Sequence, residues 1–399
     1  MSLPRLIFVN RVYWPSTQAT AQLLTDLAEG LAAQGWTVHV ITAGAGSTRQ
    51  HDVMIHRTGT PESHGGLVSR ALTHRAFLRA ARRQLAALVQ PGDLVVPMTD
   101  PPLLAAAVAR EAAARGARVV PWIQDIYPEI AAVHFGPLSG FFLLPLKVSR
   151  NSVWRAAATC VTLGADMART VSVQGVPADR LAIIPNWAPR ELHAPAAPAA
   201  IAACRDRWGL TGKFVVAYSG NLGRVHEFET ILQAAAILRD QPDVVFLFIG
   251  QGARFDEVNA AARTRGLTNL RLLPPEPRGN LAASLAAADA HLVTLRPEYS
   301  ALVYPSKLAG VLAAGRPVLF VGPVTGEIRQ LLERDQCGAA FSPGAGAGLA
   351  TTITRWQSDA TRRTGLGANA RAAYERHFTG AAALAAWDQL LRRISGTAL

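Results

Sequence analysis

Residues 303–320, VYPSKLAGVLAAGRPVLF, join the start of a helix, a glycine stop and a buried strand in one short stretch. The spacing predicts a helix that begins at about Pro305 or Ser306 and ends at Gly315, with an apolar strand directly after it. Such a short helix feeding a continuous apolar strand is typical of a parallel sheet with helices on both faces. Lys307 is the single charge in this predicted helix.

The same alternation of strand and helix extends over the whole chain. Apolar runs between Ala/Leu/Arg-rich helical stretches are LIFV, VHVITA, DLVVPMTD, RVVPWIQD, TCVTLG and LAIIPN in the first half, and FVVAYSGN, VVFLFIGQG, LRLLPP, AHLVTLRP and PVLFVGP in the second. These runs are continuous rather than alternating, which indicates buried parallel strands. The sequence therefore predicts an α/β protein with two doubly wound, Rossmann-like parallel-sheet domains.

The length of 399 residues suits two domains of ordinary size. A Pro/Ala-rich stretch, PRELHAPAAPAAIAA, predicts a linker near residues 188–200. We expect an N-terminal Rossmann-like domain at 1–190 and a C-terminal Rossmann-like domain at 200–375. The last helix, within 376–399, follows no strand of its own, and the architecture favours its crossing back to the first domain.

Composition limits the classes of partner. Lysine and arginine exceed aspartate and glutamate by 40 to 28, a formal charge of +12, which favours nucleotide phosphates or an anionic lipid surface. Nucleic acid is not predicted, because the basic residues form no tract interleaved with aromatics. The three cysteines, Cys160, Cys204 and Cys337, fit no metal spacing, and neither a metal nor a cofactor is predicted. Without a leader pattern or a spanning apolar run, we expect a cytoplasmic protein, at most peripheral on the inner face of the plasma membrane.

Four strand-end loops of the second half carry candidate binding chemistry: SGNLGR (219–224), IGQGAR (249–254), LPPEPRGN (273–280) and VYPSK (303–307). In an open parallel sheet, ligands bind beyond the carboxyl ends of the strands. A lysine in the first turn of a helix opposes the helix dipole, so Lys307 indicates a bound anion. A lysine whose charge extends into solvent is an equally good interpretation of these residues alone.

The other loops offer donors of different kinds. Ser306 can cap the helix or bond a phosphate oxygen, Gly220 lets backbone approach a ligand, and Asn221 and Arg224 supply side-chain donors. A tight strand-to-helix turn explains SGNLGR as well. IGQGAR lacks the third glycine of a dinucleotide fingerprint, so nicotinamide binding is not predicted.

Six motifs in order resemble the retaining glycosyltransferase family four, which has the two-Rossmann GT-B architecture with domains facing a central cleft. They are FVNRVYWPSTQATAQLLTDLAEGLAAQGWTVHVITA, PWIQDIYPE, IIPNWAP, SGNLGR, FLFIGQG and PSKLAGVLAAGRPV. The likeness covers nearly the whole chain and is strongest to bacterial surface-polysaccharide enzymes of the N-acetylfucosaminyltransferase type.

This resemblance implies transfer of a sugar, of amino or deoxyamino type, from a UDP-linked donor to a hydroxyl of a glycan or lipid-linked acceptor in surface polysaccharide synthesis. It also implies that 1–190 is the acceptor-side domain and that 200–375 is the nucleotide-sugar domain. It assigns Asn221, Arg224 and Lys307 to the donor diphosphate, and Pro275 and Glu276 to the base. The residues of the same loops add Gly220 and Ser306 as candidates for the diphosphate, and Gln251 and Glu298 as candidates for the base and ribose. The candidates for catalysis are Asp125, Arg224 and Lys307. Retention needs mainly leaving-group stabilisation, since the departing phosphate oxygen can take the acceptor's proton.

The chain also departs from the family pattern. A Glu-x7-Glu pair, whose second member binds ribose, falls on Leu302 and Gly310, so we expect Gly310 to face the ribose without a side-chain bond. A family histidine falls on Gln124, and a family Lys falls on His226. Each candidate also has a purely structural interpretation. Asp125 could cap the following helix instead of contacting the sugar, and His226 could face solvent instead of the phosphate. Glu298 could replace the missing ribose carboxylate or be an exposed loop residue.

Two other functions remain open, a non-catalytic GT-B protein that binds a nucleotide sugar or a partner, and a GT-B epimerase. Residues 70–88 and 135–155 combine arginines with Phe and Leu, which indicates contact with an anionic membrane surface. The alternative is that their apolar faces belong to the domain core.

Overall fold

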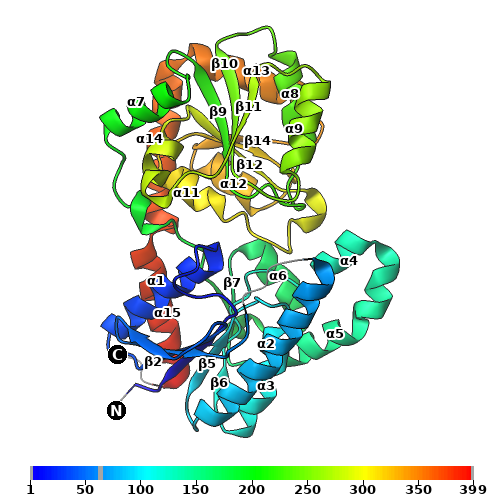
Figure 1. The fold of residues 1–399 in the computed structure, drawn as a ribbon, viewed down its shortest axis with the longest axis vertical. Helices are drawn as coiled ribbons and strands as arrows, with labels where there is room; N and C mark the ends of the chain where they lie inside the picture. The colour runs from blue at the N-terminus through cyan, green and yellow to red at the C-terminus, as the bar shows by residue number, and fades with distance from the viewer. Residues whose placement is uncertain (1–2, 62–65, 397–399) are drawn as a thin grey trace. The chain divides into compact units, whose positions relative to one another are not determined.

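The computed structural model describes residues 3–61 and 66–396. The chain divides into two compact units, each built around its own sheet (Figure 1). Unit 1 comprises Met1–Asn186, Ala301–Tyr304 and Gly380–Leu399. Unit 2 comprises Trp187–Ser300 and Pro305–Thr379.

Unit 1 contains a six-stranded sheet of order β3-β4-β2-β1-β5-β6. Its strands are β1 Leu6–Val9, β2 Val38–Thr42, β3 Thr48–Gln50, β4 Val53–Arg57, β5 Leu94–Pro97 and β6 Arg118–Val119. All neighbours are parallel except β3 and β4. β7 Cys160–Thr162 and β8 Leu181–Ile183 form a separate parallel pair. The chain order reverses between β1 and β5, which makes the carboxyl ends of these strands the expected ligand-binding edge.

The helices of unit 1 are α1 Ala19–Ala33, α2 Leu67–Leu88, α3 Leu104–Ala114, α4 Glu129–Phe135, α5 Pro137–Ala156, α6 Ala165–Val173 and α15 Gly380–Ser395. Of these, α1, α2 and α3 pack on the six-stranded sheet, and α6 packs on β7 and β8. The apolar stripes of α2 and α3 pack on one face, where Phe77 and Val108 join Ile7 in a buried core. The last helix, α15, packs on α1, because Gly30 leaves no Cβ in the way of Leu384.

Unit 2 contains a six-stranded, fully parallel sheet of order β11-β10-β9-β12-β13-β14. Its strands are β9 Phe214–Ser219, β10 Val244–Ile249, β11 Leu270–Leu273, β12 Ala290–Thr294, β13 Val318–Val321 and β14 Gly338–Phe341. The central strands are buried along their length, as their continuous apolar sequences require. Here the chain order reverses between β9 and β12.

The helices of unit 2 are α7 Pro198–Arg207, α8 Glu229–Ile237, α9 Phe255–Thr264, α10 Leu281–Ala286, α11 Lys307–Ala313, α12 Glu327–Arg334, α13 Gly346–Ser358 and α14 Ala360–His377. Helices α8, α9 and α13 cover one face of the sheet (Figure 1). The main core on this face includes Phe246, Phe248 and Trp356. The opposite face carries a smaller core of Val215, Leu247 and neighbours. Short 3-10 helices are Ala178–Arg180, Arg190–Leu192, Arg278–Asn280 and Pro297–Tyr299.

The two doubly wound, Rossmann-like sheets confirm the predicted fold class. Strands β3, β4 and β14 are not predicted from the sequence, and β7 with β8 lies outside the main sheet. The stretch expected to be a linker contains structure, since Arg190–Leu192 is a 3-10 turn and α7 begins at Pro198. No helix in the described part of the chain has the length and apolar character that crossing a bilayer requires.

Candidate active site

Lys307 lies at the start of α11, beyond the switch point of the unit 2 sheet. Its Nζ donates a hydrogen bond to the Tyr218 hydroxyl, lies 3.7 Å from the centre of the Tyr218 ring, and is 3.5 Å from His226 Nε2. The side chain is half-buried. The interpretation of Lys307 as a lysine whose charge extends freely into solvent is therefore wrong.

Both partners of Lys307 are neutral. Tyr218 donates its hydroxyl proton to the Asn221 carbonyl at 2.8 Å, and burial raises the pKa of the phenol. His226 lies 2.7 Å from the Thr294 carbonyl through Nδ1, and a carbonyl only accepts, so Nδ1 carries the proton and Nε2 offers its lone pair to Lys307. Burial, with the Lys307 charge second, lowers the pKa of His226 to about 3. His226 is buried, so the solvent-facing alternative is wrong.

The positive charge of Lys307 is consequently uncompensated. No carboxylate within the described residues forms an ion pair with it, and burial lowers its pKa well below the ordinary 10.5. A desolvated cation with neutral neighbours costs folding free energy. A bound anion would remove that cost, which is the electrostatic character expected of a phosphate site.

Glycines bring two loops together beside this lysine. Gly220 has φ of 124°, and a Cβ there would lie 3.6 Å from Lys307 Cε. A Cβ on Gly250 would lie 2.0 Å from the Gly220 carbonyl oxygen, which backbone cannot accommodate. The loops 219–224 and 249–254 are joined by a 2.7 Å hydrogen bond from the Leu222 N–H to the Gln251 carbonyl. The glycines therefore set the close packing of these loops rather than a nicotinamide fingerprint.

Two contributors to this site are missed by the sequence analysis. Tyr218 lies in an apolar strand, where an aromatic residue predicts core packing, and its contact to Lys307 spans 89 residues of chain. Arg254 donates to the His226 carbonyl at 2.8 Å and to Glu257 at 2.8 Å, which fixes the position of the loop that carries His226. The GAR ending of the second loop is the signal that could have indicated Arg254.

The other predicted donor-site residues occupy the surrounding loops. Ser306 is exposed at the N-cap of α11 and makes no capping side-chain bond. The side chains of Asn221, Arg224, Gln251 and Pro275 are exposed. Glu276 is ion-paired to Arg207 at 2.8 Å, and Glu298 to Arg296, so both carboxylates have a partner within unit 2.

Gly310 is buried in α11. A Cβ there would contact Leu192 Cδ1 at 3.4 Å and Leu285 Cδ1 at 3.7 Å, both ordinary van der Waals distances. A side chain at position 310 would therefore begin in contact with two leucines. That Gly310 faces the ribose stays a prediction.

In unit 1, Asp125 is the charged residue at the sheet edge that corresponds to Lys307 in unit 2. It follows β6 toward the carboxyl edge of that sheet, and its backbone forms a bridge with Val303. Burial raises its pKa to about 6, with the charge of Asp100 as a second cause. The helix after it, α4, begins at Glu129 with Pro128 at the N-cap, so Asp125 does not cap that helix.

Neighbouring polar residues at this edge are paired. Arg11, just after β1, holds Asp100, just after β5, with two hydrogen bonds of 3.0 and 2.9 Å. Gln124 and Asn186 form a reciprocal amide pair at 3.2 and 2.8 Å, both buried. Gln124 is therefore committed to Asn186. Asp125 forms no ion pair with a described residue, whereas Asp100 is paired with Arg11. Residues 3–61 and 66–396 contain no cluster of His, Cys, Asp or Glu suited to a metal ion.

Each half of the chain matches a known family. Residues 19–187 match the Glycosyl transferase 4-like domain, and residues 203–373 match the Glycosyl transferases group 1 family. Together the two matches include Asp125 of unit 1 and Lys307, Tyr218 and His226 of unit 2. The chain belongs to the glycosyltransferases.

Two curated relatives carry names of the same class. The chain is 32% identical over 173 residues to the putative colanic acid biosynthesis glycosyl transferase WcaI of Escherichia coli, a stretch that covers 43% of this chain and 42% of that protein. It is 29% identical over 291 residues to the probable glycosyltransferase WbjE of Pseudomonas aeruginosa, covering 72% of each. The chain thus spans less than half the length of the first relative. These matches show the class and leave the branch undefined.

Solved structures show the same fold. Sucrose-phosphate synthase from Thermosynechococcus elongatus superposes with a TM-score of 0.79 at 17% identity, covering 99% of this chain and 100% of that one. HepE of Anabaena, solved with UDP and glucose, gives a TM-score of 0.73 at 18% identity and covers 97% and 99% of the two chains. At such identities the likeness concerns the fold alone, which is GT-B, as predicted.

Proposed function

We propose that this protein is a retaining glycosyltransferase that uses a UDP-linked amino or deoxyamino sugar. The observation that carries the proposal is Lys307, a half-buried cation whose contacts, Tyr218 and His226, are neutral. A nucleotide diphosphate supplies the missing negative charge. The HepE structure, which contains UDP, supports the choice of nucleotide.

In the proposed reaction, the bond between sugar C1 and the β-phosphate oxygen breaks while the acceptor oxygen bonds to C1 on the same face. The departing phosphate oxygen takes the acceptor's proton, so the products are the glycosylated acceptor and UDP. Lys307 stabilises the charge that grows on the diphosphate, together with exposed donors of the same loops, Asn221, Arg224 and Ser306. This step requires no protein base, in keeping with the engagement of Gln124 by Asn186.

Asp125 is assigned to the sugar and acceptor side of the reaction. Its pKa of about 6 leaves the carboxylate mainly ionised at neutral pH, at an energetic cost, beside Asp100. An ionised carboxylate can accept a hydrogen bond from a sugar hydroxyl and stabilise positive charge at C1 in the transition state. Pro275, Glu276, Gln251 and Glu298 remain the proposed surroundings of the base and ribose.

The acceptor is proposed to be lipid-linked and to be reached at an anionic membrane surface from the cytoplasmic side. Helix α5 leaves a strip of apolar side chains on the surface, with Phe141 and Phe142 exposed by 77% and 79%, and with Leu144, Leu146 and Val148 exposed beside them. The core interpretation is therefore wrong for these side chains of 135–155, although Trp154 of the same stretch is buried. It holds for 70–88, where Phe77 and Leu85 are core residues.

A clamp within unit 1 connects this strip with the Asp125 segment. Arg150 of α5 donates to both carboxylate oxygens of Glu129 and to the Tyr127 carbonyl, at 2.5 Å for the carbonyl, and stacks 3.9 Å over Trp154. The contact holds α5 to the chain two residues beyond Asp125. A surface that binds lipid would thus be rigidly linked to the residue assigned to the acceptor side.

The test compares nucleotides and then donors. We expect UDP, rather than GDP, ADP or TDP, to raise the melting temperature, since a ligand at 100 times its Kd stabilises by about 2.7 kcal/mol. Turnover with a panel of UDP-sugars and a lipid-linked acceptor should then release UDP and label the acceptor. Binding without turnover would support the non-catalytic alternative, and a new nucleotide sugar formed without acceptor would support an epimerase.

A further inference from the structure

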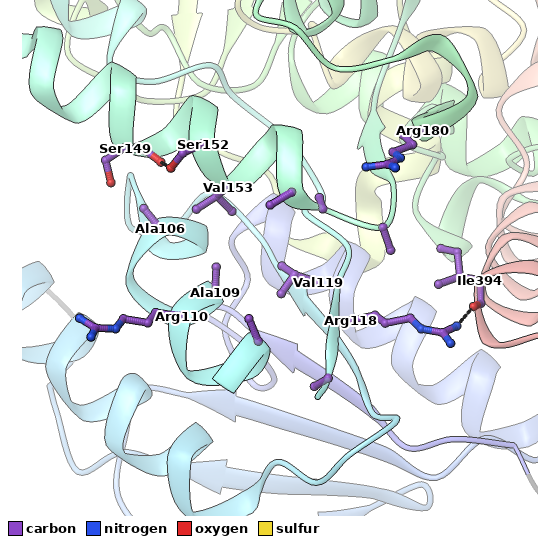
Figure 2. Close-up of a pocket in the computed structure, with 15 residues that line it drawn as sticks. Ala106, Ala109, Arg110, Arg118, Val119, Ser149, Ser152, Val153, Arg180 and Ile394 are labelled. Atoms are coloured by element: carbon purple, nitrogen blue, oxygen red, sulfur yellow. Dashed lines mark hydrogen bonds between the residues drawn. The ribbon is translucent and has the colours of Figure 1, made fainter. Parts of the chain in front are cut away.

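A second surface of unit 1 is hollowed between helices α3 and α5 (Figure 2). The hollow has a volume of about 900 Å³. Its floor consists of small side chains, including Ala109 and Ala113 of α3 and Val153 of α5, and Ser149 and Ser152 contribute hydroxyls. Such a floor lets an elongated ligand lie close to the two helix backbones.

This hollow is distinct from the proposed transfer site. Arg118 is the first residue of β6, Ala158 precedes β7, and Arg180 directly precedes β8. These residues therefore mark the amino ends of parallel strands. Asp125 follows the carboxyl end of β6, at the opposite edge. A ligand in the hollow would not occupy the acceptor position beside Asp125.

The charged residues that line the hollow are all arginines. Figure 2 shows Arg110 at one end and Arg118 and Arg180 at the other. Arg118 donates to the Ile394 carbonyl and Arg180 to the Arg155 carbonyl at 3.5 Å, and none of the three forms an ion pair with a described residue. The contrast is Arg115, the C-cap residue of α3, which is paired with Glu111 at 3.0 Å. The hollow therefore has positive charge at both ends and no lining carboxylate.

The floor and the exposed strip belong to one helix. Ser149, Ser152 and Val153 lie in α5 directly after the exposed strip, which runs from Phe141 to Val148. A ligand with a phosphate and an apolar tail matches the hollow and the strip together, because guanidinium groups bind phosphate oxygens and the strip can enter the acyl layer. A free anion would match the arginines alone.

We infer that the hollow bounded by Arg110, Arg118 and Arg180 binds the headgroup of an anionic phospholipid, so that α5 lies along the membrane. This inference rests on the proposed membrane location and is independent of the sugar transfer. The strip supplies affinity for any bilayer, and the three arginines supply the preference for negative charge.

The experiment measures binding of the full chain to vesicles of phosphatidylcholine with 30% phosphatidylglycerol, and to vesicles of phosphatidylcholine alone. Each cation close to such a surface contributes about fivefold in affinity, so replacing all three arginines by alanine should weaken binding to the anionic vesicles by roughly 100-fold. Binding to neutral vesicles should change less than about twofold. Replacing all three by lysine should retain most of the binding, since charge remains.

The matched control removes the same charge from exposed sites of unit 2, with Arg263, Arg355 and Arg362 changed to alanine. We expect this control to lose less than about threefold, and circular dichroism melting should show every variant folded. F141S with F142S should weaken binding to both vesicle types. Equal losses of affinity for the anionic vesicles in the two alanine triple variants would overturn the inference. Full displacement of the protein from these vesicles by soluble glycerol phosphate would also overturn it, because the hollow would then be a site for a free anion. UDP-sugar turnover on a soluble acceptor fails or succeeds independently of these results.

Discussion

The two strand-edge sites carry charges of opposite sign that folding leaves uncompensated. In unit 2, Lys307 has its pKa lowered by burial beside neutral Tyr218 and His226. In unit 1, Asp125 has its pKa raised to about 6 by burial and by Asp100. Nearby charges that only hold the fold are paired, as Arg11 is with Asp100. The comparison teaches that the functional candidates are the charges for which a ligand, rather than a neighbour, supplies the partner.

The largest effect is expected at the cationic site. Lys307→Met keeps apolar packing over the Tyr218 ring and removes the charge, so kcat/KM for the UDP-sugar should fall by about 2 to 4 kcal/mol of transition-state free energy, roughly 30- to 1000-fold. The melting temperature should rise, because a desolvated cation is removed. Steady-state kinetics and thermal melting measure the two effects.

Lys213→Met is the control for that variant. Lys213 is ion-paired with Asp243 at 2.9 Å in the same unit, so its removal should leave turnover within about twofold and should not raise the melting temperature. If Lys307→Met retained turnover within threefold of the wild type, the assignment of a diphosphate to this lysine would be lost.

At the anionic site, the free energy of unfolding should depend on pH through the charge of Asp125. Asp125→Asn should reduce turnover by about 100-fold. It should also stabilise the fold at pH 8 by about 1 to 3 kcal/mol. The reason is that the folded-state pKa of about 6, instead of 3.8, makes the ionised carboxylate of the wild type costly at this pH. The folded wild type binds the proton more tightly than the unfolded chain does, so its own stability rises between pH 6 and 4. The advantage of the variant should vanish over that interval in denaturant titrations.

Asp52→Asn provides the comparison, since Asp52 is exposed beside Arg49 and should show no such gain. A stability difference between Asp125→Asn and wild type that did not change from pH 8 to pH 4 would mean that the carboxylate is not strained in the folded state.

Gly310→Glu tests how far the cationic site extends along α11. A carboxylate directed at Leu192 and Leu285 should cost about 3 kcal/mol of unfolding free energy and should not tighten UDP binding. Gly365→Glu, at an exposed position of α14 with open space around it, should be neutral or slightly stabilising. Tighter UDP binding in calorimetry with unchanged stability would show that the side chain reaches the ribose.

Sequence patterns predict the fold well where burial fixes the composition. Every quoted apolar run contains a strand, because a strand covered on both faces must be continuously apolar. The missed strands do not satisfy that condition. Thr48–Gln50 is a polar antiparallel edge, and Gly338–Phe341 is short and composed mainly of small residues. Propensity alone does not separate such edges from loops.

The candidate site is predictable only in part, for a physical reason. Lys307 is visible in sequence because a cation conflicts with the helix start on which it lies. Its partners are invisible, since Tyr218 and His226 approach it from 89 and 81 residues away. Periodicity likewise cannot decide whether an apolar helix face is covered, which is why α2 and α5 look alike in sequence and differ in exposure.

The smallest predicted effect concerns the hydroxyl that positions the lysine. Tyr218→Phe keeps the ring beneath Lys307 and removes the oxygen that accepts from Nζ and donates to the Asn221 carbonyl at 2.8 Å. Loss of one such bond costs about 1 kcal/mol, so kcat/KM should fall about five- to tenfold with the fold intact. Tyr299→Phe, another buried tyrosine of unit 2, should stay within twofold of wild type. Wild-type turnover in Tyr218→Phe would mean that the ring and His226 alone hold the lysine in place, and the role given to the hydroxyl would then be dropped.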